Sequence, residues 1–185
     1  MTSGKKKNPG ETSRLLHAIR FAAEQHRDHR RKGKTAAPYI NHPIAVAEQL
    51  ARAGHEDNTD LLMAAVLHDV VEDTETEAED LEALFGPKVT QFVMEVSDDK
   101  SLEAYERKKL VVRNIAEKSP EAQLIKLSDI VANVYDVIHH PPNWDDQRKG
   151  WYFDWCENVV DKIRGTHKEL EAQFDELILE ARKGL

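Results

Sequence analysis

The sequence has few of the residues that mark several classes of protein. It holds one cysteine, Cys156, so no disulfide can form within the chain, and a reducing compartment such as the cytoplasm is the expected setting. Eight glycines and seven prolines are too few for a collagen-like or low-complexity chain. The longest uninterrupted apolar run, Leu61 to Leu67, is far below the ~18 residues that suggest a membrane span. The basic start of the chain is followed by no apolar segment, so we expect no secretory signal.

Basic residues are fewer than acidic ones. The chain has 26 Lys and Arg against 34 Asp and Glu, which gives a formal net charge of −8. This balance argues against a nucleic-acid partner, because a duplex-binding protein needs a large basic surface. With 185 residues, 40% of them hydrophobic and 32% charged, the chain is expected to form one globular domain with its own core. The sequence leaves the oligomeric state open.

The spacing of apolar residues predicts an all-α fold. Apolar side chains recur at helical intervals from Thr12 to about Arg31, which predicts a first helix there. The run from 61 to 67 is apolar on every side, so its helix is expected to be central, with Asn58 or Thr59 as its cap. Other predicted helices run from Pro43 to Gly54, from a Thr76/Glu79 capping box to Gly86, from Pro87 onward, from Ser101 to Lys118, from Pro120 to about His140, and as a final pair split near Gly165 by a Thr166/Glu169 capping box.

The chain therefore divides simply. Residues 1–10 are expected to be a disordered tail, and residues 11–185 a single helical domain. A short β-hairpin within residues 31–41 or 70–80 is left open.

Four ionisable residues directly follow the most apolar helix: His68, Asp69, Glu72 and Asp73. On one continuous helix, residues four apart share a face, so these groups would emerge within about one turn. Ionisable groups at the end of a buried helix need solvent or partners. Imidazole and carboxylate are both good ligands for first-row metals. Taken alone, the segment fits a metal site and a solvated helix end about equally.

Two further segments bear on that choice. His42 stands at a predicted helix start, and Lys126, Asp129 and Asn133 form a polar line on the long helix. Each alone is explained more simply, as a helix cap and as an exposed helix face. The combination of His42, His68–Asp69 and Asp129 instead favours a metal site, because its members are ligand types that one ion can share.

A basic stretch stands out in the acidic chain. Five of the residues from Arg27 to Lys34 are Lys or Arg. They could simply stabilise the carboxyl end of a helix through its dipole. They could also bind the phosphates of a nucleotide, since guanidinium groups pair with phosphate oxygens. Tyr39 could line the same site or be a buried structural residue.

The spacing H…HD…D resembles that of the HD-domain metal-dependent phosphohydrolases. Several segments resemble, in the same order, the hydrolase domain of the RelA/SpoT alarmone enzymes: PYINHP (38–43), LHDVVEDT (67–74), LFG (84–86), SDDK (97–100), ERK (106–108) and KLSDIVAN (126–133). The segment from Trp144 through Glu169 is similar to the short, stand-alone hydrolases of the metazoan SpoT-homologue type. The resemblance covers residues 14–182.

The resemblance implies a single-domain, HD-type helical bundle that binds one Mn²⁺ ion. Its implied metal ligands are His42, His68, Asp69 and Asp129. Its implied catalytic pair, which would position and deprotonate the attacking water, is Glu72 and Asp73. Its implied substrate-binding residues are Arg27, Arg31, Lys32, Tyr39 and Asn133.

The implied activity is that of a Mn²⁺-dependent guanosine-3′,5′-bis(diphosphate) 3′-pyrophosphohydrolase. Such an enzyme degrades the alarmones of the stringent response, ppGpp and pppGpp, to GDP or GTP and pyrophosphate. Two alternatives stay open: a phosphatase for another nucleotide, such as the 2′-phosphate of NADPH, and a sensor that binds a nucleotide without turnover. The pair Glu72 and Asp73 argues against the sensor, because binding alone would not need it.

The sequence departs from this family at a few positions. The family usually has Lys or Arg directly after the last metal ligand and two residues after the asparagine, where this chain has Ile130 and Tyr135. The segment between Lys32 and Pro38 is also longer than in many bacterial members. None of these changes removes an implied ligand, but they leave recognition of the base open.

Overall fold

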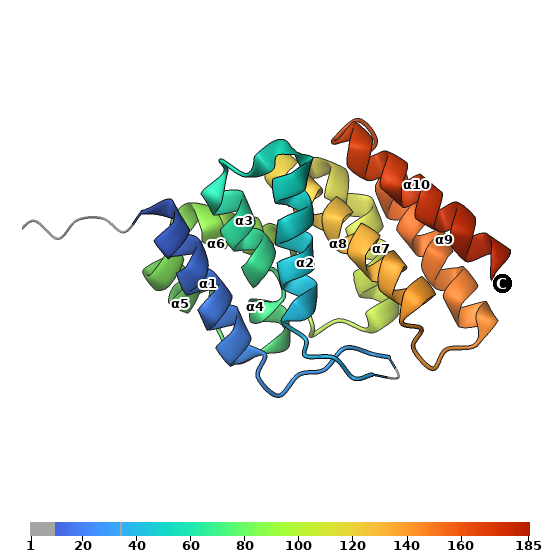
Figure 1. Cartoon of the computed structure of the whole chain (residues 1–185), viewed down its shortest axis with the longest axis horizontal. Helices are drawn as coiled ribbons and strands as arrows, with labels where there is room; N and C mark the ends of the chain where they lie inside the picture. Colours follow the sequence, from blue (N-terminus) through green and yellow to red (C-terminus); the bar gives the residue numbers. More distant parts are fainter. Residues whose placement is uncertain (1–9, 34) are drawn as a thin grey trace, which may run out of the picture.

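The computed structural model describes residues 10–33 and 35–185, and helices occupy most of this chain (Figure 1). Apart from Gly10, the tail expected over residues 1–10 lies outside the described residues. In chain order the elements are α1 (Glu11–Gln25), α2 (Asn41–Leu50), a π-helical turn (Ala51–His55), α3 (Thr59–Leu67), α4 (Val70–Asp73), α5 (Ala78–Phe85), α6 (Pro87–Val96), α7 (Ala104–Asn114), a 3-10 turn (Ile115–Glu117), α8 (Pro120–His139), α9 (Asp146–Lys162) and α10 (Lys168–Lys183). The all-α prediction is confirmed. Within the described residues, none of these helices combines the length and apolarity needed to cross a membrane.

The helix at the centre of the fold is α3, as its apolar run predicts. Every residue from Leu61 to Leu67 is buried, with at most 5% of its surface exposed. Helices α1, α2, α6 and α8 pack against it (Figure 1). Of the two expected caps Asn58 is the one used, and its side chain accepts a hydrogen bond from the Leu61 N–H at 3.2 Å. Close packing on all sides holds the residues that follow Leu67 in place.

The long helix α8 has the predicted extent. The Ser119 side chain caps it by accepting a hydrogen bond from the Ala122 N–H at 3.2 Å. Pro120 takes the first position, where a missing N–H costs nothing. Helices α2 and α10 both pack against α8. The last two helices are separated near Gly165, which has a φ of +95° that favours glycine.

The first helix is shorter than the periodicity predicts. It ends at Gln25 rather than near Arg31, and His26 forms its C-cap. The His26 side chain is 2% exposed, and its ring packs on that of Tyr39 with centroids 4.8 Å apart. This tertiary contact fixes where the chain leaves the helix, and no local pattern encodes it.

The segment after α1 runs out and back before α2 begins (Figure 1). The Arg31 N–H donates to the Ala37 carbonyl at 2.9 Å. In the described residues this pairing amounts to one isolated antiparallel bridge, Arg30 with Pro38, so the hairpin left open by the sequence is only rudimentary. At Gly33 a Cβ atom would lie 2.9 Å from the His140 carbonyl oxygen, so this loop packs closely on the end of α8.

Both predicted capping boxes are wrong by one residue. The box of α5 is formed by Glu77 and Asp80, and the N-cap of α10 is His167. Both threonine side chains are directed instead at the segment that precedes the helix. Thr76 accepts a hydrogen bond from the Thr74 hydroxyl at 2.9 Å. Thr166 donates to the Ile163 carbonyl at 2.6 Å.

Two other helix bounds need correction. Helix α2 begins at Asn41, so Pro43 is its third residue and not its first. Helix α7 spans Ala104–Asn114 and then passes into the 3-10 turn. The helix is therefore shorter than the predicted Ser101 to Lys118. Helix α6 begins at Pro87, directly after Gly86, and helix α8 begins at Pro120, as the sequence predicts.

Candidate metal centre

The residues of the H…HD…D pattern meet where three helices approach one another. His42 is the second residue of α2, Asp129 lies in the middle of α8, and His68–Asp69 lie between α3 and α4. The sequence predicted that His68 to Asp73 would share one helix, and this is wrong. The helix breaks after Leu67 and resumes at Val70, so His68 and Asp69 form the turn between two helices.

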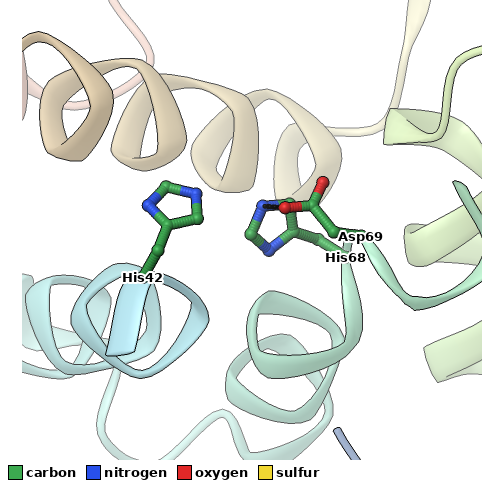
Figure 2. Close-up of side chains that lie close together, drawn as sticks. All are labelled: His42, His68 and Asp69. Atoms are coloured by element: carbon green, nitrogen blue, oxygen red, sulfur yellow. Dashed lines mark ion pairs between the residues drawn. The ribbon is translucent and has the colours of Figure 1, made fainter. Parts of the chain in front are cut away.

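The ligating atoms of this group face one another. One atom from each of His42, His68 and Asp69 lies within 4.8 Å of the others (Figure 2). An Oδ1 atom of Asp129 lies 3.0 Å from His42 Nε2 and 3.7 Å from His68 Nε2. The His68 Nε2 also lies 3.1 Å from Asp69 Oδ2. Two imidazole nitrogens and the Asp69 carboxylate thus face one point, and the Asp129 carboxylate lies beside both imidazoles; divalent first-row metals accept such a donor set.

The orientation of His68 supports this interpretation. Its Nδ1 atom lies 2.7 Å from the Ala65 carbonyl oxygen and donates a hydrogen bond to it. Nδ1 therefore carries a proton, and Nε2 is the nitrogen that faces the carboxylates and is placed to ligate a metal. That Nε2 atom is buried and has no hydrogen-bond partner of good geometry. A backbone carbonyl that fixes one ring nitrogen while the other is free is the usual arrangement of a metal-binding histidine.

The electrostatics of the group favour a bound cation. Burial opposes charge on Asp69, but His68 beside it holds the pKa of that carboxyl well below its usual range. Burial likewise opposes charge on Asp129, and Lys126 and both histidines lower its pKa. Burial would lower the pKa of His68, yet the two carboxylates raise it to about 10, so without a metal Nε2 also holds a proton, which a bound cation would displace. Both acids therefore stay ionised, and they attract positive charge to this point.

Two α8 residues hold Asp129 in place. The Lys126 Nζ atom lies 3.3 Å from Asp129 Oδ2, and the Asn133 side-chain amide donates to Asp129 Oδ1 at 2.6 Å. Burial lowers the pKa of Lys126, but the surrounding carboxylates, Asp129 first, raise it overall. The line of polar residues on this helix therefore faces the centre and not solvent.

Tyr39 also belongs to this centre. Its hydroxyl donates to Asp69 Oδ2 at 2.5 Å. Burial and the charge of Asp69 raise the pKa of Tyr39, so the hydroxyl stays protonated and can act as this donor. The sequence left open whether Tyr39 lines the site or is structural, and this contact places it at the site.

Glu72 and Asp73 follow on α4. The Glu72 Oε1 atom lies 3.3 Å from an Arg107 guanidinium nitrogen, and Oε2 accepts the Asp98 N–H at 3.2 Å. Burial and nearby acids raise the pKa of Glu72. Asp73 pairs with Lys100 at 2.5 Å. The sequence assigned no role to Arg107 or Lys100, although both lie in the ERK and SDDK segments.

The structure brings only some residues of the basic stretch to the site. The Arg31 guanidinium bonds to Asn133 Oδ1 at 2.7 Å and to Asp136 at 2.7 and 2.9 Å, and lies 5.6 Å from the Tyr39 ring centroid. The structure does not bring Arg27 to this group: its side chain is exposed and paired with Glu24.

A cavity of about 750 Å³ lies beside the metal centre, between α2, α8 and α10. Its lining includes Arg31, Lys32, His42, Tyr135, Asp136 and Glu176. It reaches the centre through His42, so a ligand there could contact both. At the two positions that depart from the family, Ile130 is buried in the core, whereas Tyr135 is 47% exposed and its ring contacts that of His139 at a tilt of 49°.

Comparisons with known proteins agree with this geometry. A family model described as HD domain matches residues 18–137. Guanosine-3′,5′-bis(diphosphate) 3′-pyrophosphohydrolase MESH1 of Drosophila melanogaster is 44% identical over 90% of this chain and 93% of its own length. The Homo sapiens protein of that name is 42% identical over 90% of this chain and 94% of its own.

One solved structure matches over nearly the whole chain. It is described as a metazoan ortholog of SpoT that hydrolyses ppGpp. The two structures share 43% identity and a TM-score of 0.89, over 97% of this chain and 99% of the other. The similarity therefore includes α9 and α10, which lie beyond the residues that the family model matches.

Proposed function

The chain belongs to the HD-domain family, in the group of the MESH1 3′-pyrophosphohydrolases, and from this we propose that it hydrolyses guanosine 3′,5′-bis(diphosphate). Water would break the bond between the ribose 3′ oxygen and its diphosphate. The products would be GDP and pyrophosphate, or GTP and pyrophosphate from pppGpp. The observation that carries the proposal is the largely buried group of two histidines and two aspartates, followed one helical turn later by Glu72, whose pKa is raised by burial and by nearby acids that include Asp69.

We propose one Mn²⁺ ion as the cofactor, held by His42, His68, Asp69 and Asp129. The buried Nε2 of His68, which lacks a hydrogen-bond partner of good geometry, and the two ionised carboxylates support this ligand set. Mn²⁺ accepts such a mixed shell of nitrogen and oxygen ligands, whereas structural Zn²⁺ is held in closed tetrahedral sites. This donor set therefore suits Mn²⁺ better. When bound, the ion supplies positive charge that polarises phosphate and makes water more acidic.

Glu72 is proposed to take a proton from the attacking water. Its raised pKa makes it a stronger base than an exposed glutamate, and Arg107 and the Asp98 N–H fix the direction of its carboxylate. Asp73 would help to orient the same water, and its pairing with Lys100 would keep it in place.

The nucleotide is proposed to bind along the cavity beside the centre. Arg31 is already held by Asn133 and Asp136, so it can contact a base or a phosphate with little loss of side-chain freedom. Lys32 lines the same cavity and would offset phosphate charge. Tyr39 and Asn133 would connect the nucleotide to Asp69 and Asp129.

We further propose that residues 11–185 act as one domain. The family model covers its first part, and α9 and α10 pack against α7 and α8. The free, buried thiol of Cys156 supports a reducing compartment such as the cytoplasm. We expect a small guanosine nucleotide as the partner, and neither nucleic acid nor a membrane.

A nucleotide panel tests the proposed activity. The protein is stripped with EDTA, reloaded with Mn²⁺ and incubated with ppGpp, pppGpp, GDP, GTP or NADPH, and the products are separated by ion-exchange chromatography. Equal amounts of GDP and pyrophosphate from ppGpp are expected. Release of orthophosphate first, or loss of GDP as fast as ppGpp, would indicate a broader phosphatase. Turnover of NADPH alone would assign the 2′-phosphate as substrate.

A further inference from the structure

An aromatic cage surrounds the ammonium group of Lys108. This lysine lies on α7, and the rings come from α9. Its Nζ atom lies 3.5 Å from the Trp155 ring centroid, 5.2 Å from that of Tyr152 and 5.6 Å from that of Trp151. The Trp155 indole N–H also donates to the Lys108 carbonyl at 3.0 Å, so the lysine and one wall of its cage are locked together. Cation–π contacts of this kind hold a charge in a fixed position.

The Lys108 ammonium has no acidic partner. Among the described residues it takes part in no ion pair and no side-chain hydrogen bond, although Lys109 beside it pairs with Glu106. Burial lowers the pKa of Lys108. Aromatic faces cannot accept three N–H bonds as oxygen atoms do, and an ammonium that is partly shielded from water is stabilised by an anion. The cage therefore holds a positive charge that is incompletely compensated.

The cage lies on helices that border those of the metal centre, since α7 contacts α4 through Arg107 and α9 packs on α8. Arg107, the residue before Lys108, reaches Glu72 from the same helix. Burial first, and then nearby charges that include Asp98 and Asp129, shift the pKa of Lys108; burial, Cys156 and Asp129 raise the pKa of Tyr152. Helix α9 packs on both α7 and α8, and it lies outside the residues matched by the HD-domain model.

We propose that Lys108 is a phosphate-binding residue, and that its ammonium contacts an oxygen of the diphosphate group that is removed. The inference rests on the proposed function, since it takes the ligand to be the 3′-diphosphate or the pyrophosphate product. A diphosphate supplies the oxygen acceptors that the cage lacks. A cation fixed in advance beside the reacting phosphorus stabilises the charge that develops there without having to reorganise.

Inorganic pyrophosphate is the probe for a first test. Lys108→Met keeps the length and most of the packing of the side chain and removes its charge. Calorimetry on the Mn²⁺-loaded protein should show that pyrophosphate binds about 10- to 100-fold more weakly, the usual loss for a hydrogen bond to a charged group. Lys108→Arg should recover part of the affinity. Lys109→Met is the matched control and should bind like the unmodified protein.

The rate of ppGpp hydrolysis is measured on the same variants, with Mn²⁺ content and thermal melting. We expect kcat/KM to fall for Lys108→Met while metal content is kept. Unchanged pyrophosphate affinity and unchanged kcat/KM in a folded Lys108→Met protein would overturn the inference and leave the proposed function intact. Pyrophosphate binding that depends on Lys108 in a protein that does not hydrolyse ppGpp would overturn the function and keep the binding site.

A second measurement needs no variant and covers the case in which Lys108→Met does not fold. The unmodified Mn²⁺-loaded protein is reductively methylated with and without pyrophosphate, and each lysine is quantified by mass spectrometry. We expect pyrophosphate to protect Lys108 and not Lys109. Equal methylation of Lys108 in both samples would show that the ammonium does not contact the anion.

Discussion

Replacing Glu72 by glutamine separates the removal of a proton from the binding of metal. The amide has the shape of the carboxylate and can still accept the Asp98 N–H, which lies 3.2 Å from Oε2. It cannot accept a proton from water, and it loses the charge that faces Arg107 at 3.3 Å. General-base catalysis usually contributes ~10²–10⁴ in rate, so Glu72→Gln should raise the activation barrier by about 2.7–5.5 kcal/mol.

The assay is kcat for ppGpp at saturating Mn²⁺ and saturating substrate, together with the metal content of each purified variant. Glu72→Gln should hold as much Mn²⁺ as the unmodified protein, because the Glu72 carboxylate is directed at Arg107 and the Asp98 N–H and not at the two histidines. Glu75→Gln removes the same charge from an exposed residue three positions along, and it should leave kcat unchanged.

Two results would refute this reasoning. Normal turnover by Glu72→Gln would show that Glu72 takes no proton, and Asp73 would then be the next candidate. Recovery of full activity on adding excess Mn²⁺ would show that Glu72 supports the metal. Mutation of a residue that only orients metal ligands typically weakens metal binding by about 10–100-fold.

The metal ligands, the raised pKa of Glu72 and the buried core each lead to a further testable outcome. EDTA should abolish hydrolysis and Mn²⁺ should restore it; activity that survives complete chelation would exclude the metal. Asp69→Asn should lower Mn²⁺ content and activity together, as metal analysis and rates would show. Because burial raises the folded-state pKa of Glu72, its contribution to stability is largest below the unfolded pKa of about 4.3 and is lost as pH rises through the folded pKa. Glu72→Gln should therefore raise the Tm of the metal-free protein at pH 7 and change it little near pH 4; equal shifts would contradict this. Leu61→Ala, in the fully buried helix, should lower the free energy of unfolding by about 2–5 kcal/mol in denaturant titrations, and the 60%-exposed Leu16→Ala by under about 0.5 kcal/mol.

Local signals in the sequence predict much of the fold correctly. The central helix follows from the apolar run after Asn58, and α6 and α8 begin at their prolines. These signals are reliable because caps and apolar periodicity act within a few residues. The errors arise where the capping side chain bonds elsewhere, as at Thr166, whose hydroxyl contacts Gln123 of α8, or where another segment packs over the helix end, as at His26.

The ligand candidates could also be named from the sequence. His42, His68, Asp69 and Asp129 stand at spacings that resemble a known pattern, and the structure brings their ligating atoms together. What the sequence could not supply is the break at His68. A helix pattern gives directions around one axis, and so it placed these residues on a continuous helix that does not exist.

The neighbours of the centre depend on how separate helices pack. Basic residues look alike along the chain, yet Arg31 joins Asn133 and Asp136, whereas Arg27 pairs outward with Glu24. Arg107 and Lys108 are adjacent in sequence, and only the packing of α7 against α4 and α9 gives one a carboxylate and the other an aromatic cage. Residue types and local spacing thus define the helices and the candidate ligands. The partners of each charge are set by contacts between segments far apart in the chain, because distances between helices depend on the packing of the whole core.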